Sequence, residues 1–261
     1  MAEYNQVYQK AVYYDIAFNR DVSREVDFMV ALYHRQTGAD LHSTLDIACG
    51  PGYHAREFAK RGIRAVGLDL RPEMLVFAQE QAALENVTIQ WIAQDMRRFE
   101  LEEPVDMAIS MFDGIDALLT NIDLIQHFQA VAANLTENGL FLIDVTHPRD
   151  CSFQDYGTFV YNGCRNETVV DVVWATNMPT FDLVSAVAQV NIEMRVSENG
   201  RQQVISDTAY ERLLLPQELA LLAERSGMFQ AVGWYGDFDL NQPLDNSPAS
   251  RRLIAIMQKV R

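Results

Sequence analysis

Three aspartates stand where three successive apolar segments of the sequence end, and their positions predict a ligand site. Asp46 lies near the end of the first segment, Asp69 ends the second 23 residues later, and Asp95 follows the third, 26 residues further on. A carboxylate at the end of a second parallel strand is well placed to accept two ribose hydroxyls. An acid in the first strand suits a ligand that carries a cation, and the third acid can accept a hydrogen bond from an adenine amine. The alternative is that all three acids cap loops and helices.

A glycine-rich turn, "ACGPG" at Ala48–Gly52, follows Asp46 almost directly. A dinucleotide-binding fingerprint has glycines at G-x-G-x-x-G, and counted from Ala48 its third glycine would fall on Tyr53. No Gly-Lys-Ser/Thr follows, so the turn does not read as a phosphate loop. Cation, ribose and adenine together describe S-adenosylmethionine, whose methionyl part would lie near the free N–H groups where the next helix begins. Cys49 is interpreted as a small space-filler in this turn rather than a nucleophile.

The elements that must position these acids alternate between strands and helices from residue 41 to residue 145. Such alternation predicts a parallel sheet with right-handed crossovers. The preceding residues 3–37 are predicted to be mostly helical. Strands are expected at 41–48, 63–70, 87–93, 105–111 and 140–145, and helices at 54–61, 72–84 and 122–135, the last closed by Glu137-Asn138-Gly139.

After His147-Pro148 the pattern changes to strands without intervening helices. Apolar and polar residues alternate along residues 183–196, as in a half-buried antiparallel strand, and "SENG" at 197–200 predicts a hairpin turn. The expected strands here are 168–175, 183–196 and 203–211; a helix at 216–226 and strands at 229–235 and 252–258 follow. The layout predicts a three-layer α/β domain that carries an antiparallel insertion at about 150–211.

The charge and composition narrow the classes of partner. The 21 Lys and Arg against 36 Asp and Glu give a formal net charge of −15, which repels nucleic acids and anionic membranes. No run of about 18 apolar residues exists, and the N-terminus lacks the pattern of a secretory signal. The three cysteines are odd in number and scattered, which fits a reducing compartment better than disulfides or a zinc site. We therefore expect a cytoplasmic protein with no nucleic-acid, membrane or metal partner.

Five segments in order resemble the successive motifs of class I S-adenosylmethionine-dependent methyltransferases: "LDIACGPGYHA", "VGLDLRPEML", "WIAQDMRRF", "VDMAISMFDGIDAL" and "LTENGLFLIDVTHP". The resemblance covers about 41–148 and departs from the family at Ala48, where glycine is usual. It implies a Rossmann-like three-layer sandwich with a mostly parallel seven-stranded sheet and an antiparallel β cap inserted after strand five. The methyltransferase domain would be 1–149 plus 212–261, with 1–37 as a helical lid, and the cap would be 150–211.

The resemblance also assigns the cofactor, S-adenosyl-L-methionine, which leaves as S-adenosyl-L-homocysteine. "VYYDIAF" near the N-terminus resembles a segment that covers this cofactor in small-molecule members of the family. The residues expected to bind it are Tyr14, Asp46, Ala48, Cys49, Gly50, Gly52, His54, Asp69, Leu70, Met74, Asp95, Met96 and Met111.

Methyl transfer needs a base only when the acceptor must lose a proton, so the catalytic residues are harder to predict. The candidates lie after strands four and five, where parallel sheets bind ligands. They are Asp113, Asp116, Asp144, His147, Arg149 and Asp150; of these Asp116 and His147, together with Tyr14, are our predicted catalytic residues. Asp113 and Asp116 could instead be acids at a helix start, His147 a structural loop histidine, and Tyr14 ordinary helix packing.

The aromatic residues of 150–211 indicate what the insertion does. Its position resembles the β cap of glycine N-methyltransferase-like and nucleotide-sugar N,N-dimethyltransferase-like enzymes, which implies a small-molecule acceptor, an amine or other nitrogen slightly ahead of oxygen. Arg149 and Arg165 could hold an acceptor carboxylate. A homo-oligomer through the cap stays open, as do three other functions: protein methyltransferase, NAD-dependent oxidoreductase and non-catalytic cofactor-binding module. The rings are Phe153, Tyr156, Phe159, Tyr161, Trp174, Phe181 and Tyr210.

Overall fold

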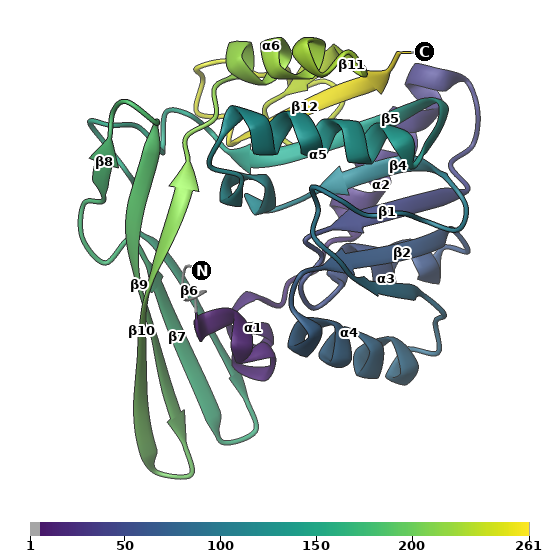
Figure 1. Cartoon of the computed structure of the whole chain (residues 1–261). Coiled ribbons are helices and arrows are strands. Elements are labelled where there is room, and N and C mark those ends of the chain that lie inside the picture. The colour runs from purple at the N-terminus through teal and green to yellow at the C-terminus, as the bar shows by residue number, and fades with distance from the viewer. Residues whose placement is uncertain (1–5, 261) are drawn as a thin grey trace.

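The computed structural model describes residues 6–260, which form two β-sheets (Figure 1). The larger sheet has seven strands in the order β11-β12-β5-β4-β1-β2-β3. Strands β3, β2, β1, β4 and β5 are parallel, whereas β12 is antiparallel to both β5 and β11. Its strands are β1 Ser43–Ile47, β2 Arg64–Asp69, β3 Gln90–Ala93, β4 Val105–Ser110, β5 Leu135–Thr146, β11 Phe229–Tyr235 and β12 Arg252–Lys259.

Helices cover both faces of this sheet because its strands are apolar on both sides. Helices α5 Asn121–Ala133 and α6 Pro216–Ser226 pack on one face, in a core with Leu45, Phe141 and Leu253. Helices α2 Ser23–Thr37 and α3 Tyr53–Lys60 pack on the other, and α4 Pro72–Leu84 lies against β2 and β3. The chain order reverses at β1, whose neighbours are β2 and β4, so the ends of these strands meet where ligands bind in such sheets.

The second sheet is antiparallel, in the order β10-β9-β7-β6, with the short β8 paired to β9. Asn199 and Gly200 both have positive φ between β9 and β10, so the predicted hairpin turn is confirmed. Helix α1 Ala11–Phe18 packs on this sheet through Ile16 and Phe18, and Figure 1 shows it between this sheet and α4. The strands are β6 Phe159–Arg165, β7 Thr168–Trp174, β8 Thr180–Asp182, β9 Val187–Glu198 and β10 Arg201–Arg212.

Two predicted elements differ from the structure, and two of its strands were not predicted. Residues 6–37 contain a short 3₁₀ helix, η1 Gln6–Gln9, and two separate α-helices rather than one helical stretch; residues 3–5 lie outside the described part. The predicted closure of α5 at 137–139 is wrong, because the helix ends at Ala133 and these residues form an irregularity within β5. The strands β6 at 159–165 and β8 at 180–182 were not predicted. The cap boundary at 150–211 stays a prediction.

Candidate functional site

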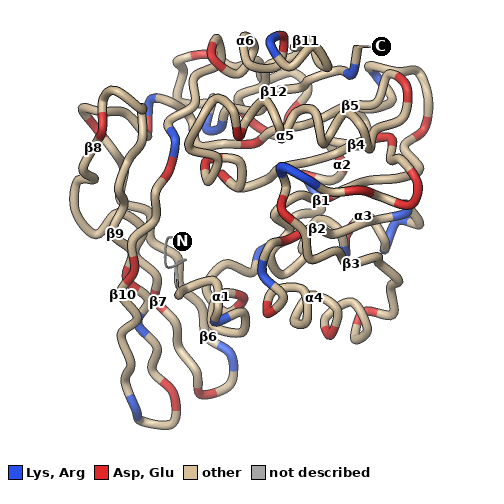
Figure 2. Tube along the Cα trace, in the orientation of Figure 1, with Lys and Arg blue, Asp and Glu red and all other residues tan. Residues whose placement is uncertain are grey.

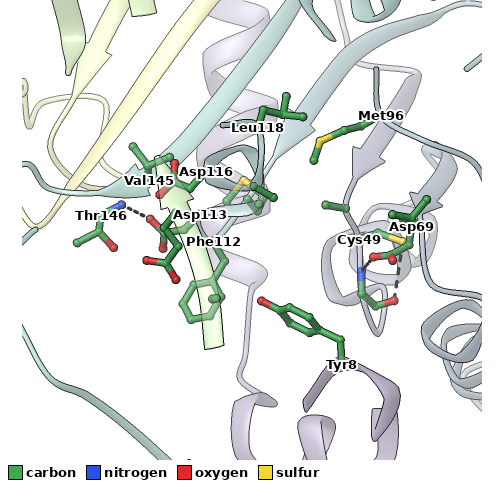
Figure 3. Close-up of a pocket in the computed structure, with 18 of the residues that line it drawn as sticks. Tyr8, Cys49, Asp69, Met96, Phe112, Asp113, Asp116, Leu118, Val145 and Thr146 are labelled. Atoms are coloured by element: carbon green, nitrogen blue, oxygen red, sulfur yellow. Dashed lines mark hydrogen bonds between the residues drawn. The ribbon is translucent and has the colours of Figure 1, made fainter. Parts of the chain in front are cut away.

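A cavity of about 490 Å³ lies between the carboxyl edge of the larger sheet, helix α1 and the antiparallel sheet. Figure 3 shows Asp69 and Cys49 on one side of it and Asp113 and Asp116 on the other, with the ring of Tyr8 between them. Nearly all predicted cofactor residues line this cavity: Tyr14, Asp46, Ala48, Cys49, Gly50, His54, Asp69, Leu70, Met74, Asp95, Met96 and Met111.

The glycine turn is tied to Asp69 by its own backbone. The N–H of Gly50 donates to Asp69 Oδ2 and the N–H of Arg71 donates to Oδ1, both at 2.8 Å. A Cβ built on Gly50 would meet no atom within 4 Å, so this side of the turn faces open space. Burial raises the pKa of Asp69 above its ordinary value, although both N–H donors oppose the rise. The carboxylate is thereby fixed at the cavity wall and keeps lone pairs for a ligand.

Gly52, the remaining predicted cofactor residue, does not line the cavity formed by the described residues. It has φ +75° and packs against Trp91 of β3, whose ring also lies against Gly67 of β2. A Cβ on Gly52 would lie 2.5 Å from that ring. Gly52 therefore serves the close approach of the turn to the sheet.

Asp46 lies behind the turn, near a group of ionisable side chains. Its Oδ2 accepts from the N–H of Ala55 at 3.2 Å, and burial raises its pKa to about 6. The neighbouring His54 contacts Glu25 of α2 at 2.5 Å, and Glu25 pairs with Arg20, which also lines the cavity. A cationic ligand beside Asp46 would favour its ionised form.

Asp95 is paired with a residue that the sequence did not single out. Arg97 donates to both of its carboxylate oxygens and also to Asp123 of α5, and the hydrogen bonds from Arg97 lower the pKa of Asp95. The next residue, Met96, is held through its backbone carbonyl, which accepts from His127 Nδ1 at 2.8 Å. Arg97 lies at the cavity wall beside two predicted cofactor residues, Asp95 and Met96.

The N-terminal segment, η1 and α1, forms another wall of the cavity. Tyr14 stacks on Phe18 with ring centroids 4.2 Å apart and contacts Tyr8, and all three line the cavity. Burial raises the pKa of Tyr14, so its phenol stays protonated at neutral pH. Buried Asp15 accepts from Tyr53 at the start of α3 and pairs with Arg165 of β6. Arg165 thus joins α1 to the antiparallel sheet and does not line the cavity formed by the described residues.

An acidic region closes the other end of the cavity, after β4 and β5. Arg252 of β12 pairs with Asp113 at 3.1 Å and with Asp144 at 2.7 Å. Asp113 and Asp116 line the cavity, the latter from the 3₁₀ helix η2 Gly114–Ala117. Asp116 Oδ1 has no hydrogen-bond partner among the described residues. Burial, with the charges of Asp113 and Glu211, raises the pKa of Asp116 well above its ordinary range.

Glu211, on β10, reaches the same end of the cavity from the antiparallel sheet. Its Oε2 accepts from the hydroxyl of Tyr156 and its Oε1 from Trp174 Nε1 at 2.6 Å. Burial raises its pKa, and the two donors oppose the rise. Sequence reasoning missed Glu211, although it stands beside the predicted aromatic Tyr210 at the end of a predicted strand; no local signal gives the direction of its side chain.

His147 does not line the cavity, unlike the prediction that it acts on an acceptor. Its Nε2 donates to the carbonyl of Asp245 at 2.9 Å and its Nδ1 accepts from the N–H of Arg149 at 3.1 Å. Both ring nitrogens are therefore used in holding the loop. Arg149 donates to three carbonyls of the 246–250 loop, and neither it nor Asp150 lines the cavity formed by residues 6–260.

Two further properties concern the described residues as a whole. No group of three or more His, Cys, Asp or Glu side chains is arranged to hold a metal ion within residues 6–260. None of the helices in that range is both long enough and apolar enough to cross a membrane.

Comparison with known proteins gives a match to one family. Residues 44–139 match the family model described as a methyltransferase domain. A putative methyltransferase of Geobacillus sp. (strain WCH70) is 36% identical over 113 residues, which cover 42% of this chain and 46% of that protein. The dTDP-3-amino-3,4,6-trideoxy-alpha-D-glucopyranose N,N-dimethyltransferase of Streptomyces venezuelae is 28% identical over 134 residues, 50% of this chain and 54% of that protein. The chain thus spans about half the length of these curated relatives.

A solved structure is similar over nearly the whole chain. The S-adenosylmethionine-dependent methyltransferase from Clostridium acetobutylicum ATCC 824 covers 97% of this chain and 96% of its own, with TM-score 0.76 and 17% identity. This similarity confirms the predicted fold class, a three-layer class I methyltransferase fold with a separate antiparallel sheet.

Proposed function

We propose, from the methyltransferase domain that residues 44–139 carry, that this chain is an S-adenosylmethionine-dependent methyltransferase acting on a nitrogen of a small molecule. One observation carries the proposal. A single cavity joins the strand-end acids Asp46, Asp69 and Asp95 to a second acidic end at Asp116 and Glu211. The first group suits an adenosyl cation, and the second suits an acceptor ammonium.

The residues present fit S-adenosylmethionine. Asp69 is anchored by two backbone N–H groups and still has lone pairs for ribose hydroxyls. Asp46 is a buried acid whose pKa of about 6 an ammonium would lower, so binding a cation there relieves an unfavourable burial. Met96 and Asp95 would face the adenine, and Gly50 leaves open space for the methionyl part.

When bound, the cofactor supplies an electrophilic methyl group on a sulfonium. The protein's own residues align the acceptor, exclude water and remove a proton. Asp116 in its ionised form would accept a proton from the acceptor ammonium, which becomes a neutral amine with a free lone pair. Tyr8, Tyr14 and Phe18 would close the cavity toward the antiparallel sheet. The methylated product carries the positive charge, which the acids of this end stabilise.

The test combines binding and turnover. Calorimetry should detect S-adenosylhomocysteine binding, and labelled S-adenosylmethionine should transfer its methyl group to members of a panel of amines. Asp116→Asn should lower turnover by about 10²-fold or more, the usual contribution of a positioned base, while cofactor affinity stays within about twofold. Asp171→Asn removes an exposed acid of β7 and serves as the matched control. Binding of NAD without S-adenosylhomocysteine, or full turnover in Asp116→Asn, would contradict the proposal.

A further inference from the structure

We infer that the acceptor is a compact amine without a phosphate group, whose ammonium lies between Asp116 of η2 and Glu211 of β10. The inference rests on the proposed function and specifies its substrate class. It comes from two carboxyl groups that different sheets bring to one end of one cavity.

The acidic end holds more carboxyl groups than basic residues that pair with them among the described residues. Four carboxyl groups, those of Asp113, Asp116, Asp144 and Glu211, act on one another there, and Arg252 pairs with two of them. Arg252 contacts Asp113 and Asp144 but not Asp116, whose Oδ1 has no partner among the described residues. Burying a carboxyl group without a partner costs free energy, so a cationic ligand that pairs with Asp116 would stabilise this end of the cavity.

Glu211 differs from Asp116 in how it is held. Tyr156 and Trp174 each donate one hydrogen bond to it, which fixes the carboxylate and stabilises its ionised form. A carboxylate offers about four lone-pair sites, so two remain for an ammonium. Glu211 is thus held in one orientation, and an acceptor ammonium beside it would favour its ionised form; Asp116 is the group with room to take a proton.

Arginines near this end are already committed to other groups. Arg20, which lies over the Phe112 ring at 4.9 Å from its centroid, pairs with Glu25, and Arg252 pairs with its two aspartates. Arg149 donates to loop carbonyls, and Arg212 donates to Glu218, Asn121 and the carbonyl of Leu119. In Figure 2 the basic positions are scattered among acidic ones along the trace. Phosphates require several cationic or N–H donors, so a nucleotide-linked acceptor would meet repulsion here.

The rest of the acceptor end is aromatic. Phe112, Phe159, Tyr161 and Trp174 line it, and Arg252 lies behind the ring of Phe112 at 5.9 Å from its centroid. Aromatic faces bind apolar groups and stabilise ammonium ions. The occupant would therefore combine an amine with a small apolar or aromatic body. The relative from Streptomyces venezuelae is named for a dTDP-linked amino sugar, and this chain is inferred to differ from it in that respect.

The experiment measures binding to the protein saturated with S-adenosylhomocysteine. Three probes are compared by calorimetry: 2-phenylethylamine, its uncharged analogue 2-phenylethanol, and UDP-glucosamine. The amine should bind at least tenfold more tightly than the alcohol, and UDP-glucosamine should bind more weakly than the amine. Glu211→Gln should reduce this amine preference about tenfold or more, because it removes a charge-assisted contact. Glu193→Gln, which removes an acid that lies on β9 and does not line the cavity, should leave the preference unchanged.

Each contrary outcome has a distinct meaning. Equal affinity for amine and alcohol, no detectable amine binding, or an unchanged preference in Glu211→Gln would overturn the inference while the proposed function stands. Tighter binding of UDP-glucosamine than of the amine would show that the acceptor is nucleotide-linked. Failure of S-adenosylhomocysteine itself to bind would overturn the proposed function and this inference together.

Discussion

Gly163 of β6 lies directly against the backbone of helix α1 at Ile16. A Cβ built on Gly163 would lie 1.7 Å from the backbone oxygen of Ile16, where real Cβ atoms keep at least 3.0 Å. Gly163→Ala must therefore displace α1 by about 1.3 Å, since a backbone oxygen cannot rotate away as a side chain would. The displacement carries Tyr14 and Phe18, which line the cavity. We expect a loss of about 1–3 kcal/mol in unfolding free energy, as for other overpacked sites.

The assay pairs chemical denaturation with calorimetry of S-adenosylhomocysteine. Affinity should fall by about tenfold, since displacements of about 1 Å at binding groups are costly. Cys164→Ala changes the next residue, which is exposed, and is the matched control. If Gly163→Ala keeps both the wild-type stability and the wild-type affinity, then α1 does not pack on β6 at this position and our account of the N-terminal wall is wrong.

Three other predictions test separate parts of the site. Asp69→Asn should weaken S-adenosylhomocysteine binding by about 1.5–3 kcal/mol, the value of hydrogen bonds to a charged group. An unchanged affinity by calorimetry would show that Asp69 does not bind the ribose. Arg252→Gln should cost about 3–5 kcal/mol in urea denaturation because Asp113 and Asp144 lose their partner; a negligible cost would refute the pairing. Burial lowers the pKa of His127 to about 4, from about 6.5 in an unfolded chain. Its stabilising effect is therefore complete above about pH 6.5 and is lost as the pH falls toward 4. His127→Gln should lack this loss of about 3 kcal/mol, and equal pH slopes for the two proteins would contradict it.

The parallel sheet could be predicted from the sequence because each strand is a short apolar run between turn signals. Pro216–Ser226 was predicted to the residue, since proline and Gly227 mark its ends. Strand β6 was missed because Asn162, Gly163 and Cys164 interrupt any apolar alternation. The helix end predicted at 137–139 was wrong because Asn-Gly commonly ends helices, whereas here Asn138 takes a positive φ inside strand β5.

The acids of the predicted cofactor side could be placed together from the sequence, because they lie in or just after strands of one sheet. The residues of the acceptor side were harder to predict from the sequence. Asp116 was predicted from its place after β4, but Glu211 faces it from another sheet, 95 residues further along the chain. His147 has an appropriate residue type and position, yet its two nitrogens bond to the loop. Which way a side chain points on a loop or a cap strand depends on tertiary packing, which periodicity does not encode.

Backbone strain gives an independent reason to place function in this cavity. Four of the nine described non-glycine residues with positive φ are asparagines, which tolerate that conformation. Of the other five, Ala175 and Ala186 flank strands of the antiparallel sheet and do not line the cavity formed by the described residues, whereas the remaining three, Ala48, Phe112 and Asp113, all line it. The hydrogen bonds from Phe112 N to Asp144 and from Thr146 N to Asp113 hold the last two in place. Such strain costs about 1–3 kcal/mol per residue and persists where surrounding contacts fix it, so it tends to mark sites that bind or transform a ligand. The same turn carries Asp116, so backbone strain and an unpaired buried carboxyl oxygen occur together at this end of the cavity.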